Sequence, residues 1–491
     1  MKKIVHQDPH LETSEVAYFS INQLKDAFAS KKLTHHHLLI QLVDRIEEIE
    51  SEDGLGLCAV IGIDYEAAES AGKKLGGGAS PLAGIPVIIK DNIEVENWVC
   101  GAGTAGFGQP ANRDAALVIR LRAAGAIPFA SANMTEWAAS STETLEEGQS
   151  TRGGLTGNPW ALDRSAGSSS SGSAAAVAAG FAPIAIGTET MGSVSMPASH
   201  CGVLGMKATR GSIPIEGIIP YSATQDVPGV FARTLTDIED VMSVLMNQSV
   251  TPQGATQICI GRDPDLRESS QADDELNLAF ESLCEQLVDL GSTTTEIPRI
   301  DREEYKRIGR VLSAELVRDL DGYLAQRDGA RWKSVGEVVR ASQIASVGPD
   351  GEILTPTPCE SFESALNADP IDIEQQRTLS EAYFENLLNG MLGSSDVLLG
   401  VAYGPADKLD TSRRYKSKPY RYHSFLDSMS SIVGWPALTI PFTQINELPV
   451  GLILVARRNC EASIFGAARL LESNDLAGTF ERPFWRMPQR G

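Results

Sequence analysis

The chain has 491 residues, against roughly 150 for an average domain, so its length allows one large α/β enzyme or up to three modules. Its 42 Lys and Arg residues against 64 Asp and Glu residues give a net charge of −22, and a field of this sign repels nucleic-acid phosphates and anionic lipid headgroups. Hydrophobic residues make up 42% and charged residues 22% of the chain, which excludes extensive disorder and a fibrous protein.

The N-terminal segment and the cysteines favour a cytoplasmic location. The segment Met1–Asp8 turns polar too early to supply the apolar core of a signal peptide. The seven cysteines are widely spaced and never form a CxxC pair, so we expect reduced thiols and neither a disulfide framework nor a metal site. They are Cys58, Cys100, Cys201, Cys259, Cys284, Cys359 and Cys460.

Helical patterns dominate from about residue 20 to residue 75. Thr34 is a typical N-cap, and apolar residues recur at helical spacing from Leu38 to Ile49. A second helical stretch is expected from Tyr65 to Leu75. These N-terminal helices precede the first strong strand signal.

The apolar segment from Gly84 to Ile89 predicts a buried strand, which ends in Lys90-Asp91-Asn92. A helix over residues 114–124 and a strand over residues 126–130 follow, and this alternation is typical of an α/β fold. Residues 101–106 match the GxGxxG pattern of dinucleotide sites, but no helical pattern begins at the third glycine. We therefore expect no nucleotide cofactor.

Between Trp160 and Pro220 the composition shifts to Ser, Gly and Ala, which usually indicates close backbone approach or tight turns. The apolar run from Ala174 to Gly187 is shorter than the roughly 20 helical residues that cross a bilayer. It predicts a buried helix that passes into a buried strand, and no membrane association.

The stretch from about residue 265 to residue 395 has a helical, charged pattern without the strand signals of its neighbours. Strand patterns return at residues 396–401 and 435–455, so the stretch is interpreted as an insertion into one sheet. The sequence has no internal repeat and no low-complexity linker. It therefore predicts a single α/β domain over residues 1–491, with the insertion shaping the substrate pocket.

Two loops rich in serine and glycine carry the strongest functional signal. One is Gly167–Ser173, and the other is Gly187–Pro197, which contains Gly192-Ser193. Apolar runs flank both loops, and buried loop backbone needs hydrogen-bond partners, commonly a ligand or hydroxyl groups. Small residues around Thr190 would let a substrate carbonyl approach backbone N–H groups, so Ser193 is a candidate nucleophile.

A serine nucleophile needs a base, and the residues alone offer more than one. His200 lies seven positions after Ser193, and His423 lies far downstream. Lys90 ends an apolar strand, where burial would lower its pKa and make its neutral form available. Composition does not choose between histidine and lysine.

The sequence resembles the amidase signature family. The resemblance rests on a lysine in a segment like Pro81–Asn92, on the Gly/Ser loop, and on the Gly-Thr-acid-x-x-Gly-Ser segment that holds Ser193. Further similar segments run in the family's order and extend the match from about residue 20 to residue 475. They are Asn133–Trp137, Gly157–Trp160, Cys201–Lys207 and Leu448–Leu452.

The resemblance implies a large mixed central β-sheet covered by helices and a Ser-cisSer-Lys triad without cofactor or metal. Ser193 would attack the carbonyl carbon, Ser169 would relay the proton after a cis peptide bond, and neutral Lys90 would be the base. Ser168 is the neighbouring alternative to Ser169, and Gly172-Ser173-Ala174 aligns in favour of Ser169. Ser170 would support the relay. The oxyanion hole would be formed by the backbone amides of Thr190, Met191, Gly192 and Ser193.

The segment Gly217–Asp226 is more similar to the peptide-amidase and general-amidase branch than to glutamine-dependent subunits. Ser195 also stands where an arginine is common in the family. The sequence thus predicts an amidase that hydrolyses a linear carboxamide, such as a peptide C-terminal amide, to an acid plus ammonia or an amine. It would act as a monomer or homodimer, with the amide substrate as its partner. The alternatives are the amidase subunit of a glutamine-dependent amidotransferase and an inactive binding homologue.

Overall fold

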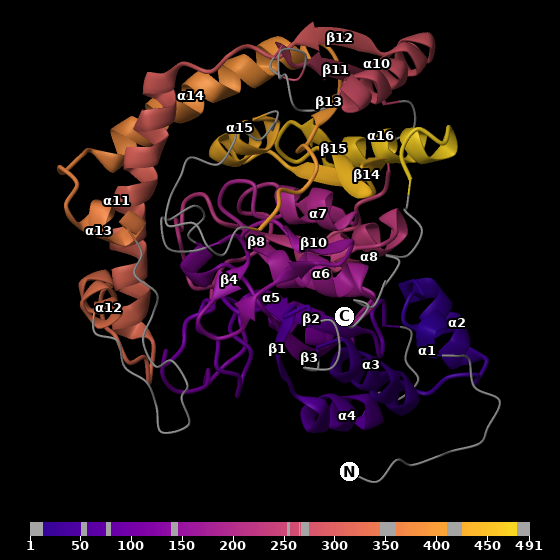
Figure 1. Cartoon of the computed structure of the whole chain (residues 1–491), viewed down its shortest axis with the longest axis vertical. Helices are drawn as coiled ribbons and strands as arrows, with labels where there is room; N and C mark the ends of the chain where they lie inside the picture. Colours follow the sequence, from indigo (N-terminus) through magenta and orange to yellow (C-terminus); the bar gives the residue numbers. More distant parts are fainter. Residues whose placement is uncertain are drawn as a thin grey trace, which may run out of the picture.

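The structure is a computed structural model that describes residues 13–50, 56–74, 80–138, 146–252, 256–264, 266, 274–343, 360–409 and 425–478. Figure 1 shows a twisted sheet with helices packed along it and a separate group of long helices along one side. The helices are α1 Thr13–Val16, α2 Ile21–Ala29, α3 His35–Glu50, α4 Tyr65–Lys74, α5 Ala116–Ala123, α6 Ser171–Ala178, α7 Ser195–Cys201, α8 Leu235–Met246, α10 Asp274–Asp289, α11 Arg302–Gln326, α12 Val335–Ser342, α13 Glu360–Leu366, α14 Ile373–Leu392, α15 Leu426–Val433 and α16 Glu461–Ser473.

Eleven strands in the described part of the chain form one mixed sheet, in the order β1-β3-β2-β8-β10-β9-β14-β15-β13-β11-β12. Neighbours β3, β2 and β8 run parallel, as do β13, β11 and β12, and the other neighbouring pairs are antiparallel. These strands are β1 Val60–Ile63, β2 Pro86–Lys90, β3 Ile127–Ala132, β8 Ile184–Glu189, β9 Leu204–Lys207, β10 Val227–Ala232, β11 Ile258–Arg262, β12 Thr293–Glu296, β13 Val397–Val401, β14 Ala437–Ile445 and β15 Leu448–Ala456. The predicted α/β class with a large mixed sheet is confirmed.

Short elements lie between β3 and α6. They are the 3-10 turn η1 Glu136–Ala138 and the two-stranded pairs β4 Gln149–Ser150 with β5 Gly154–Leu155 and β6 Gly157–Asn158 with β7 Ala161–Ser165. They bring the segment after β3 close to the loop that precedes α6, where the carbonyl of Asn133 accepts a hydrogen bond from the Gly172 amide.

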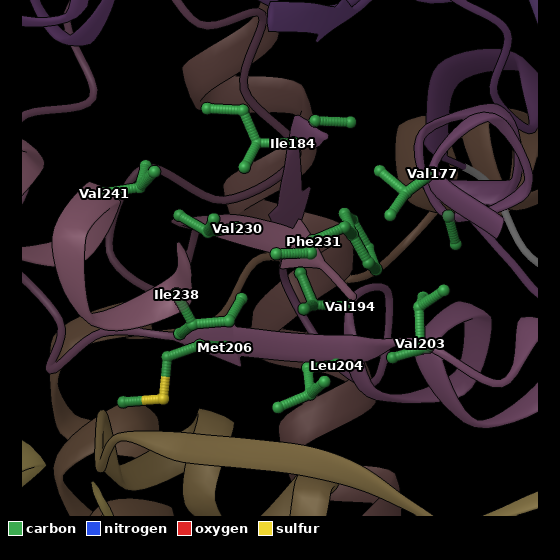
Figure 2. Packing of buried hydrophobic residues seen from close by; sticks show 14 of the residues in the cluster. Val177, Ile184, Val194, Val203, Leu204, Met206, Val230, Phe231, Ile238 and Val241 are labelled. Atoms are coloured by element: carbon green, nitrogen blue, oxygen red, sulfur yellow. The ribbon is translucent and has the colours of Figure 1, made fainter. Parts of the chain in front are cut away.

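The centre of the sheet is buried on both faces. Every residue of β2, β8 and β10 is buried, which explains why these segments are apolar runs and not alternating patterns. Figure 2 shows how β10 separates two helical layers, with Val230 toward Val241 of α8 and Phe231 toward Val177 of α6. Successive side chains of a strand point to opposite faces, so one strand contributes to both layers.

The serine, glycine and alanine content of the central segment reflects close packing, as predicted. Every residue of α6 is buried, and the helix contacts β8, β2 and α7. A Cβ atom on Gly172 would lie 2.4 Å from the carbonyl oxygen of Ala59, and one on Gly187 would lie 2.7 Å from the Ser170 hydroxyl oxygen. Larger residues here would push the two serine-rich loops away from the strands.

The predicted elements differ from the observed ones mainly at their ends. The run from Ala174 to Gly187 passes from α6 into β8, as predicted. The helix expected over 114–124 begins at Ala116, and the strand expected over 126–130 extends to Ala132. The expectation that residues 265–395 contain no strand is wrong, because Thr293–Glu296 forms β12 beside β11 at the sheet edge. This strand is largely exposed, so it lacks the apolar run that identified the buried strands.

Helices α11, α12, α13 and α14 pack on one another and form what we call the helical arm, drawn in red and orange at the left of Figure 1. Apolar residues of the arm pack against the segments that follow β2 and β3. That cluster includes Phe107, Trp137, Leu320, Trp332 and Phe362. Within the described residues, no helix has the length and apolar character needed to span a bilayer.

Candidate active site

The three residues expected to form the triad come from neighbouring parts of the sheet. Lys90 is the last residue of β2, and Ser193 lies between β8 and α7. β2 and β8 are parallel neighbours, with Ile89 opposite Ile186, so their carboxyl ends meet at one edge of the sheet. Ligands of α/β sheets commonly bind at such carboxyl ends. Ser169 lies in the loop before α6, next to this edge.

Lys90 is fully buried and surrounded by neutral oxygens. Its Nζ lies 2.8 Å from Ser169 Oγ, 2.9 Å from Ser170 Oγ and 2.9 Å from Thr188 Oγ1. Burial lowers the pKa of Lys90 from its usual 10.5 to about 7, although the charges of Asp226 and Glu189 act in the opposite direction. A lysine with this pKa is partly neutral near pH 7 and can accept a proton.

The hydrogen-bond directions distinguish the two serines that contact Lys90. The Ser170 hydroxyl donates to the Thr188 carbonyl at 3.1 Å, so it can only accept from Lys90. The two N–H groups of a neutral amine can then point to Ser170 and Thr188, which leaves the nitrogen lone pair for the proton of Ser169. Ser169 is thus placed to give a proton to Lys90, and Ser170 to orient it.

Ser168 faces away from Lys90. Its Oγ lies 2.8 Å from Thr135 Oγ1, and the Ser169 carbonyl accepts a hydrogen bond from the Thr135 amide. The peptide bond between Ser168 and Ser169 is cis, which is the geometry that the family resemblance implies. Of the two neighbouring serines, Ser169 is the one that contacts Lys90.

Ser193 is the member of the expected triad that is least buried. Its exposed fraction is 9%, against 0% for Ser169 and Lys90. The Ser193 carbonyl accepts from the Ser170 amide at 3.3 Å, which ties the two serine loops together. Within the described part of the chain the Ser193 hydroxyl has no hydrogen-bond partner, so it is available to an incoming ligand.

The turn that carries Ser193 is held by a buried carboxylate. Glu189 Oε2 accepts from the amides of Val194 at 2.7 Å and Ser195 at 3.1 Å. Gly192 has a φ of +79°, in the left-handed region that favours glycine. A Cβ atom at Gly192 would also lie 2.5 Å from the Tyr403 hydroxyl oxygen, so this turn requires glycine for both reasons.

Three of the four backbone amides expected to form an oxyanion hole are free to donate to a ligand. Among the described residues, the N–H groups of Met191, Gly192 and Ser193 donate to no protein acceptor. Successive N–H groups around a left-handed glycine form a concave surface suited to an anion. The Thr190 carbonyl accepts from Gln225 Nε2 at 2.8 Å.

Behind this turn lies a second buried lysine that the sequence did not single out for chemistry. Lys207, at the end of β9, donates to Ser431 Oγ at 2.8 Å and lies 3.5 Å from Glu189 Oε1. Burial lowers its pKa, while the charge of Glu189 opposes the shift. Tyr403, whose hydroxyl donates to Asp427, packs beside Gly192. These groups contact Glu189 and Gly192 and so support the Ser193 turn.

Sequence reasoning also missed the groups that hold Thr190. Its hydroxyl donates to Asp226 Oδ1 at 2.5 Å, and Asp226 Oδ2 accepts from the amides of Tyr221 and Ser222. Burial raises the pKa of Asp226 to about 6. Asp226 belongs to a segment that was used only to compare family branches, so no motif indicated its contact with Thr190.

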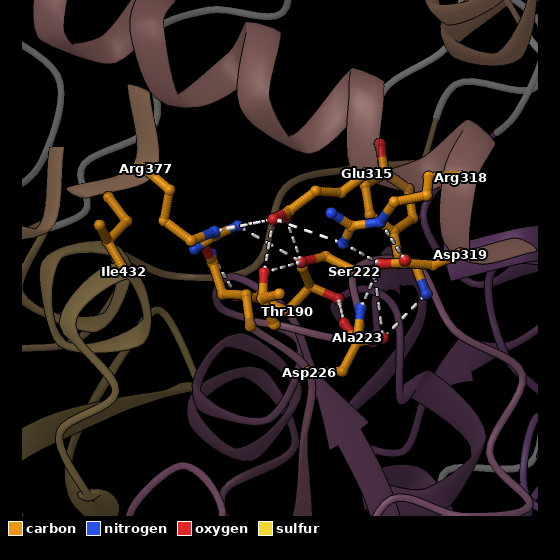
Figure 3. A network of polar contacts seen from close by, with 12 residues as sticks. Thr190, Ser222, Ala223, Asp226, Glu315, Arg318, Asp319, Arg377 and Ile432 are labelled. Carbon is orange, nitrogen blue, oxygen red and sulfur yellow. Dashed lines mark hydrogen bonds and ion pairs between the residues drawn. The ribbon is translucent and has the colours of Figure 1, made fainter. Parts of the chain in front are cut away.

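The helical arm reaches this loop through a buried ion pair, shown in Figure 3. Arg377 of α14 forms a two-pronged contact with Glu315 of α11 and also donates to Gln225 Oε1 at 3.2 Å. Glu315 in turn accepts from the hydroxyls of Ser222 and Thr224 at 2.6 Å each. Arg377 and Glu315 are 62 positions apart, so no local sequence pattern could pair them.

The structure describes one of the two histidines that the sequence offers as a base. His200 is fully buried on α7, with its ring edge-on to Tyr403 at a centroid distance of 6.0 Å. His423 lies outside the described residues. Among the residues that the structure describes, no group of three or more His, Cys, Asp or Glu side chains is arranged to hold a metal ion.

Comparison with known proteins identifies the family of the chain. The pattern of the Amidase family matches residues 37–465. The chain belongs to the amidase family. The predicted family is thereby confirmed, and the structural likeness of the chain to peptide amidase supports a hydrolase acting on amide C–N bonds.

Two curated relatives and one solved structure are similar to this chain. Both relatives are the A subunit of a glutamyl-tRNA(Gln) amidotransferase. The one from Deinococcus radiodurans is 37% identical over 250 residues, and the alignment covers 49% of each chain. The one from Symbiobacterium thermophilum is 28% identical over 495 residues, which cover 91% of this chain and 95% of the relative. The native peptide amidase of Stenotrophomonas maltophilia has a TM-score of 0.80 and 25% identity, over 95% of this chain and 99% of that chain.

Proposed function

We propose that this amidase-family chain hydrolyses a linear carboxamide, such as a peptide C-terminal amide, to a carboxylic acid plus ammonia or an amine. The observation that carries the proposal is the environment of Lys90. It is fully buried, its pKa is lowered to about 7, and its Nζ lies 2.8 Å from Ser169 Oγ. A buried base beside a serine is what nucleophilic catalysis at neutral pH requires.

In the proposed mechanism, Ser193 Oγ attacks the carbonyl carbon of the amide. Its proton passes to Ser169 as the Ser169 proton passes to neutral Lys90. The negative oxygen of the tetrahedral intermediate accepts hydrogen bonds from the amides of Thr190, Met191, Gly192 and Ser193. Loss of one such donor typically costs about 3 kcal/mol in the barrier.

Collapse of the intermediate breaks the C–N bond. Lys90 returns its proton through Ser169 to the leaving nitrogen, so ammonia or a neutral amine departs and Lys90 is neutral again. Water then attacks the acyl-Ser193 ester by the same relay and releases the acid. Ser170, which accepts from Lys90 and donates to Thr188, fixes the position of Nζ in both halves of the reaction.

The direct test is ammonia release from a panel of amides by the purified chain. The panel contains peptide amides, N-acyl amino-acid amides, short alkyl carboxamides and glutamine, and Ser193→Ala is the matched control. We expect ammonia from at least one linear carboxamide with the native chain and none above background with Ser193→Ala. Absence of activity on every amide and ester would overturn the proposal.

The second candidate is the amidase subunit of a glutamine-dependent amidotransferase, which the names of the relatives favour. That function would require partner subunits and glutamine as the ammonia source. Ser195 stands where the family resemblance has an arginine, and its hydroxyl lies 3.4 Å from Glu189 Oε2. Hydrolysis of glutamine alone in the panel would favour the amidotransferase function, whereas hydrolysis of other carboxamides without partners favours the amidase.

The third hypothesis is a binding protein that retained the fold without activity. Lys90, Ser169 and Ser193 are all present, so this hypothesis requires a triad that is complete but inert. Covalent labelling of Ser193 by a fluorophosphonate, located by peptide mass, distinguishes an active hydrolase from an inactive homologue. We expect labelling of Ser193 and slower labelling in Lys90→Ala, because the base assists the nucleophile.

A further inference from the structure

Two buried lysines flank the strand that leads to Ser193. In the order of the sheet, β2 with Lys90 lies on one side of β8, and β9 with Lys207 lies on the other side, beyond β10. β9 runs in the same direction as β8, because each is antiparallel to β10, so β2, β8 and β9 all end at the same edge of the sheet. Lys90 is the base of the proposed mechanism, which assigns no role to Lys207.

The partners of Lys207 differ in kind from those of Lys90. Lys207 has an exposed fraction of 1%, and its Nζ donates to Ser431 Oγ at 2.8 Å and lies 3.5 Å from Glu189 Oε1. Ser431 Oγ lies 2.7 Å from the same carboxylate oxygen, so its hydroxyl can donate to Glu189 while it accepts from Lys207. In a buried pair of an ammonium and a carboxylate, each group stabilises the ionised form of the other.

Other charged and ionisable groups surround this pair, but none takes the place of Lys207. They are Asp427 of α15, Arg210 after β9, Tyr403 after β13 and Lys90 of β2. Arg210 pairs with Glu381 of α14 at 2.7 Å, and the Tyr403 hydroxyl donates to Asp427. Among the residues that the structure describes, Lys207 is the only cation in an ion pair with Glu189.

Glu189 connects this pair to the nucleophile. Its other oxygen, Oε2, accepts from the amides of Val194 and Ser195, the two residues that follow Ser193. The Val194 side chain is fully buried against Gly229 of β10, where an added Cβ atom would lie 2.4 Å from Val194 Cγ2. The position of the turn therefore depends on this packing and on a group that accepts two amides at once. An ionised carboxylate accepts such bonds more strongly than a neutral acid.

We infer that Lys207 is a positioning residue for the proposed reaction, because its ammonium group keeps Glu189 ionised and the Glu189 carboxylate then fixes the turn that carries Ser193. The inference rests on the proposed function and adds to it a residue that contacts neither Ser169 nor Ser193. It also couples the two lysines. The charge of Glu189 raises the pKa of Lys90, so loss of the Lys207 cation should reach the base through Glu189.

Hydrogen–deuterium exchange of the turn tests this role without a substrate. Lys207→Met removes the charge at similar side-chain length, and the masses of peptides that span residues 190–201 report the Val194 and Ser195 amides. We expect these amides to exchange about tenfold faster in Lys207→Met than in the native chain, because a neutral Glu189 holds them less strongly. Lys207→Arg returns a cation to Glu189 and should restore most of the protection.

The matched control for the exchange experiment is Arg210→Met. It removes a neighbouring, largely buried cation that pairs with Glu381 and not with Glu189. It should lower the stability of the fold without speeding exchange in residues 190–201. Faster exchange in both variants to the same extent would show a general loosening and would overturn the inference.

The pH profile of kcat/KM tests the coupling to Lys90, on an amide identified by ammonia release. In Lys207→Met, kcat should fall about tenfold with little change in KM, because the turn that presents the nucleophile is less fixed. The midpoint of the profile should move to lower pH, because a protonated Glu189 no longer raises the pKa of Lys90. Glu189→Gln should move the midpoint in the same direction, and Lys207→Arg should restore it.

Three results would overturn the inference. They are native exchange in a folded Lys207→Met variant, fast exchange that Lys207→Arg does not reduce, and a midpoint that stays at its native pH. If Lys207→Met does not fold, Ser431→Ala removes the hydroxyl between Lys207 and Glu189 with a smaller change. Severalfold faster exchange in that variant would support the inference, and native exchange would overturn it. If the native chain hydrolyses no amide, the proposed function fails while the exchange data still test Lys207, so the two failures are distinguishable.

Discussion

The sheet edge around Lys90 and the helical arm each bury a cation, but in opposite ways. Lys90 has only hydroxyl and carbonyl oxygens as direct partners among the described residues, and burial lowers its pKa to about 7. Arg377 is buried against the carboxylate of Glu315. Burial alone would raise the pKa of Glu315, but hydrogen bonds from Arg377, Ser222 and Thr224 lower it.

This contrast indicates that the two buried side chains have different roles. A buried cation that pairs with a carboxylate stays charged and acts as a fixed link, whereas one surrounded by neutral oxygens becomes a base. Both side chains connect to the segment around Thr190. Gln225 accepts from Arg377 and donates to the Thr190 carbonyl, and Lys90 donates to the hydroxyl of Thr188, which lies on β8 just before Thr190. We propose that the sheet edge supplies the chemistry and that the arm holds the oxyanion loop and shapes the substrate pocket.

Replacing the base should have the largest effect. Lys90→Ala is expected to lower kcat/KM for an amide by about 10⁴-fold, since no other buried base contacts Ser169 in the described structure. Hydrolysis of the matching ester should fall much less, because an alkoxide or phenoxide leaves more readily without a returned proton. Initial rates on a paired amide and ester measure both losses. Equal losses would contradict the role of Lys90 in protonating the leaving group.

Breaking the arm's ion pair should have the next largest effect. Arg377→Met leaves the buried Glu315 carboxylate without its main partner, so unfolding stability should fall by about 3 kcal/mol. It also removes the donor to Gln225, so the Thr190 loop loosens and kcat should fall by about 100-fold. Thermal or urea unfolding and steady-state kinetics measure these two effects.

Two further variants separate charge from position. Arg318→Met removes another arginine near Glu315, but Arg318 is 45% exposed and should change stability by under about 0.5 kcal/mol. Arg377→Met combined with Glu315→Met removes the uncompensated charge and should recover much of the stability but not kcat. Full recovery of kcat in the double variant would show that the arm contributes stability only.

The parts of the site that were predictable lie in continuous apolar or small-residue segments. Lys90 ends a buried strand, and Ser193 follows another, so local patterns located both of them before any contact was known. The choice of lysine over histidine came from the family resemblance, and the hydrogen bonds of Lys90 to Ser169 and Ser170 agree with it. The fold class followed from the same runs, since strands buried on both faces are apolar throughout.

The parts that were missed depend on contacts between distant segments. The partners of Thr190 lie on a loop at residues 225–226, and those of Gln225 and Ser222 lie on the arm, so no periodicity or motif connects them. Strand β12 was missed because an exposed edge strand lacks an apolar run. The left-handed backbone of Trp137, with a φ of +57°, matches no sequence pattern, since this conformation is rare for a bulky residue. The single-domain organisation and the cytoplasmic location stay predictions.

The pH dependence of kcat/KM is the smallest expected effect, and it tests most specifically whether Lys90 and Arg377 have different roles. The proposed mechanism uses neutral Lys90, and a pKa of about 7 means that the neutral fraction rises roughly tenfold from pH 6 to pH 8. kcat/KM should therefore increase with pH through about 7 and level off above it.

The Asp226 charge raises the pKa of Lys90, so Asp226→Asn should shift the midpoint to lower pH. Arg377→Met lowers the plateau but should leave the midpoint in place, because Arg377 reaches the Thr190 carbonyl through Gln225 and is not among the partners of Lys90. If Arg377→Met shifted the midpoint of the pH profile and Asp226→Asn did not, the roles assigned to the sheet edge and to the helical arm would be contradicted.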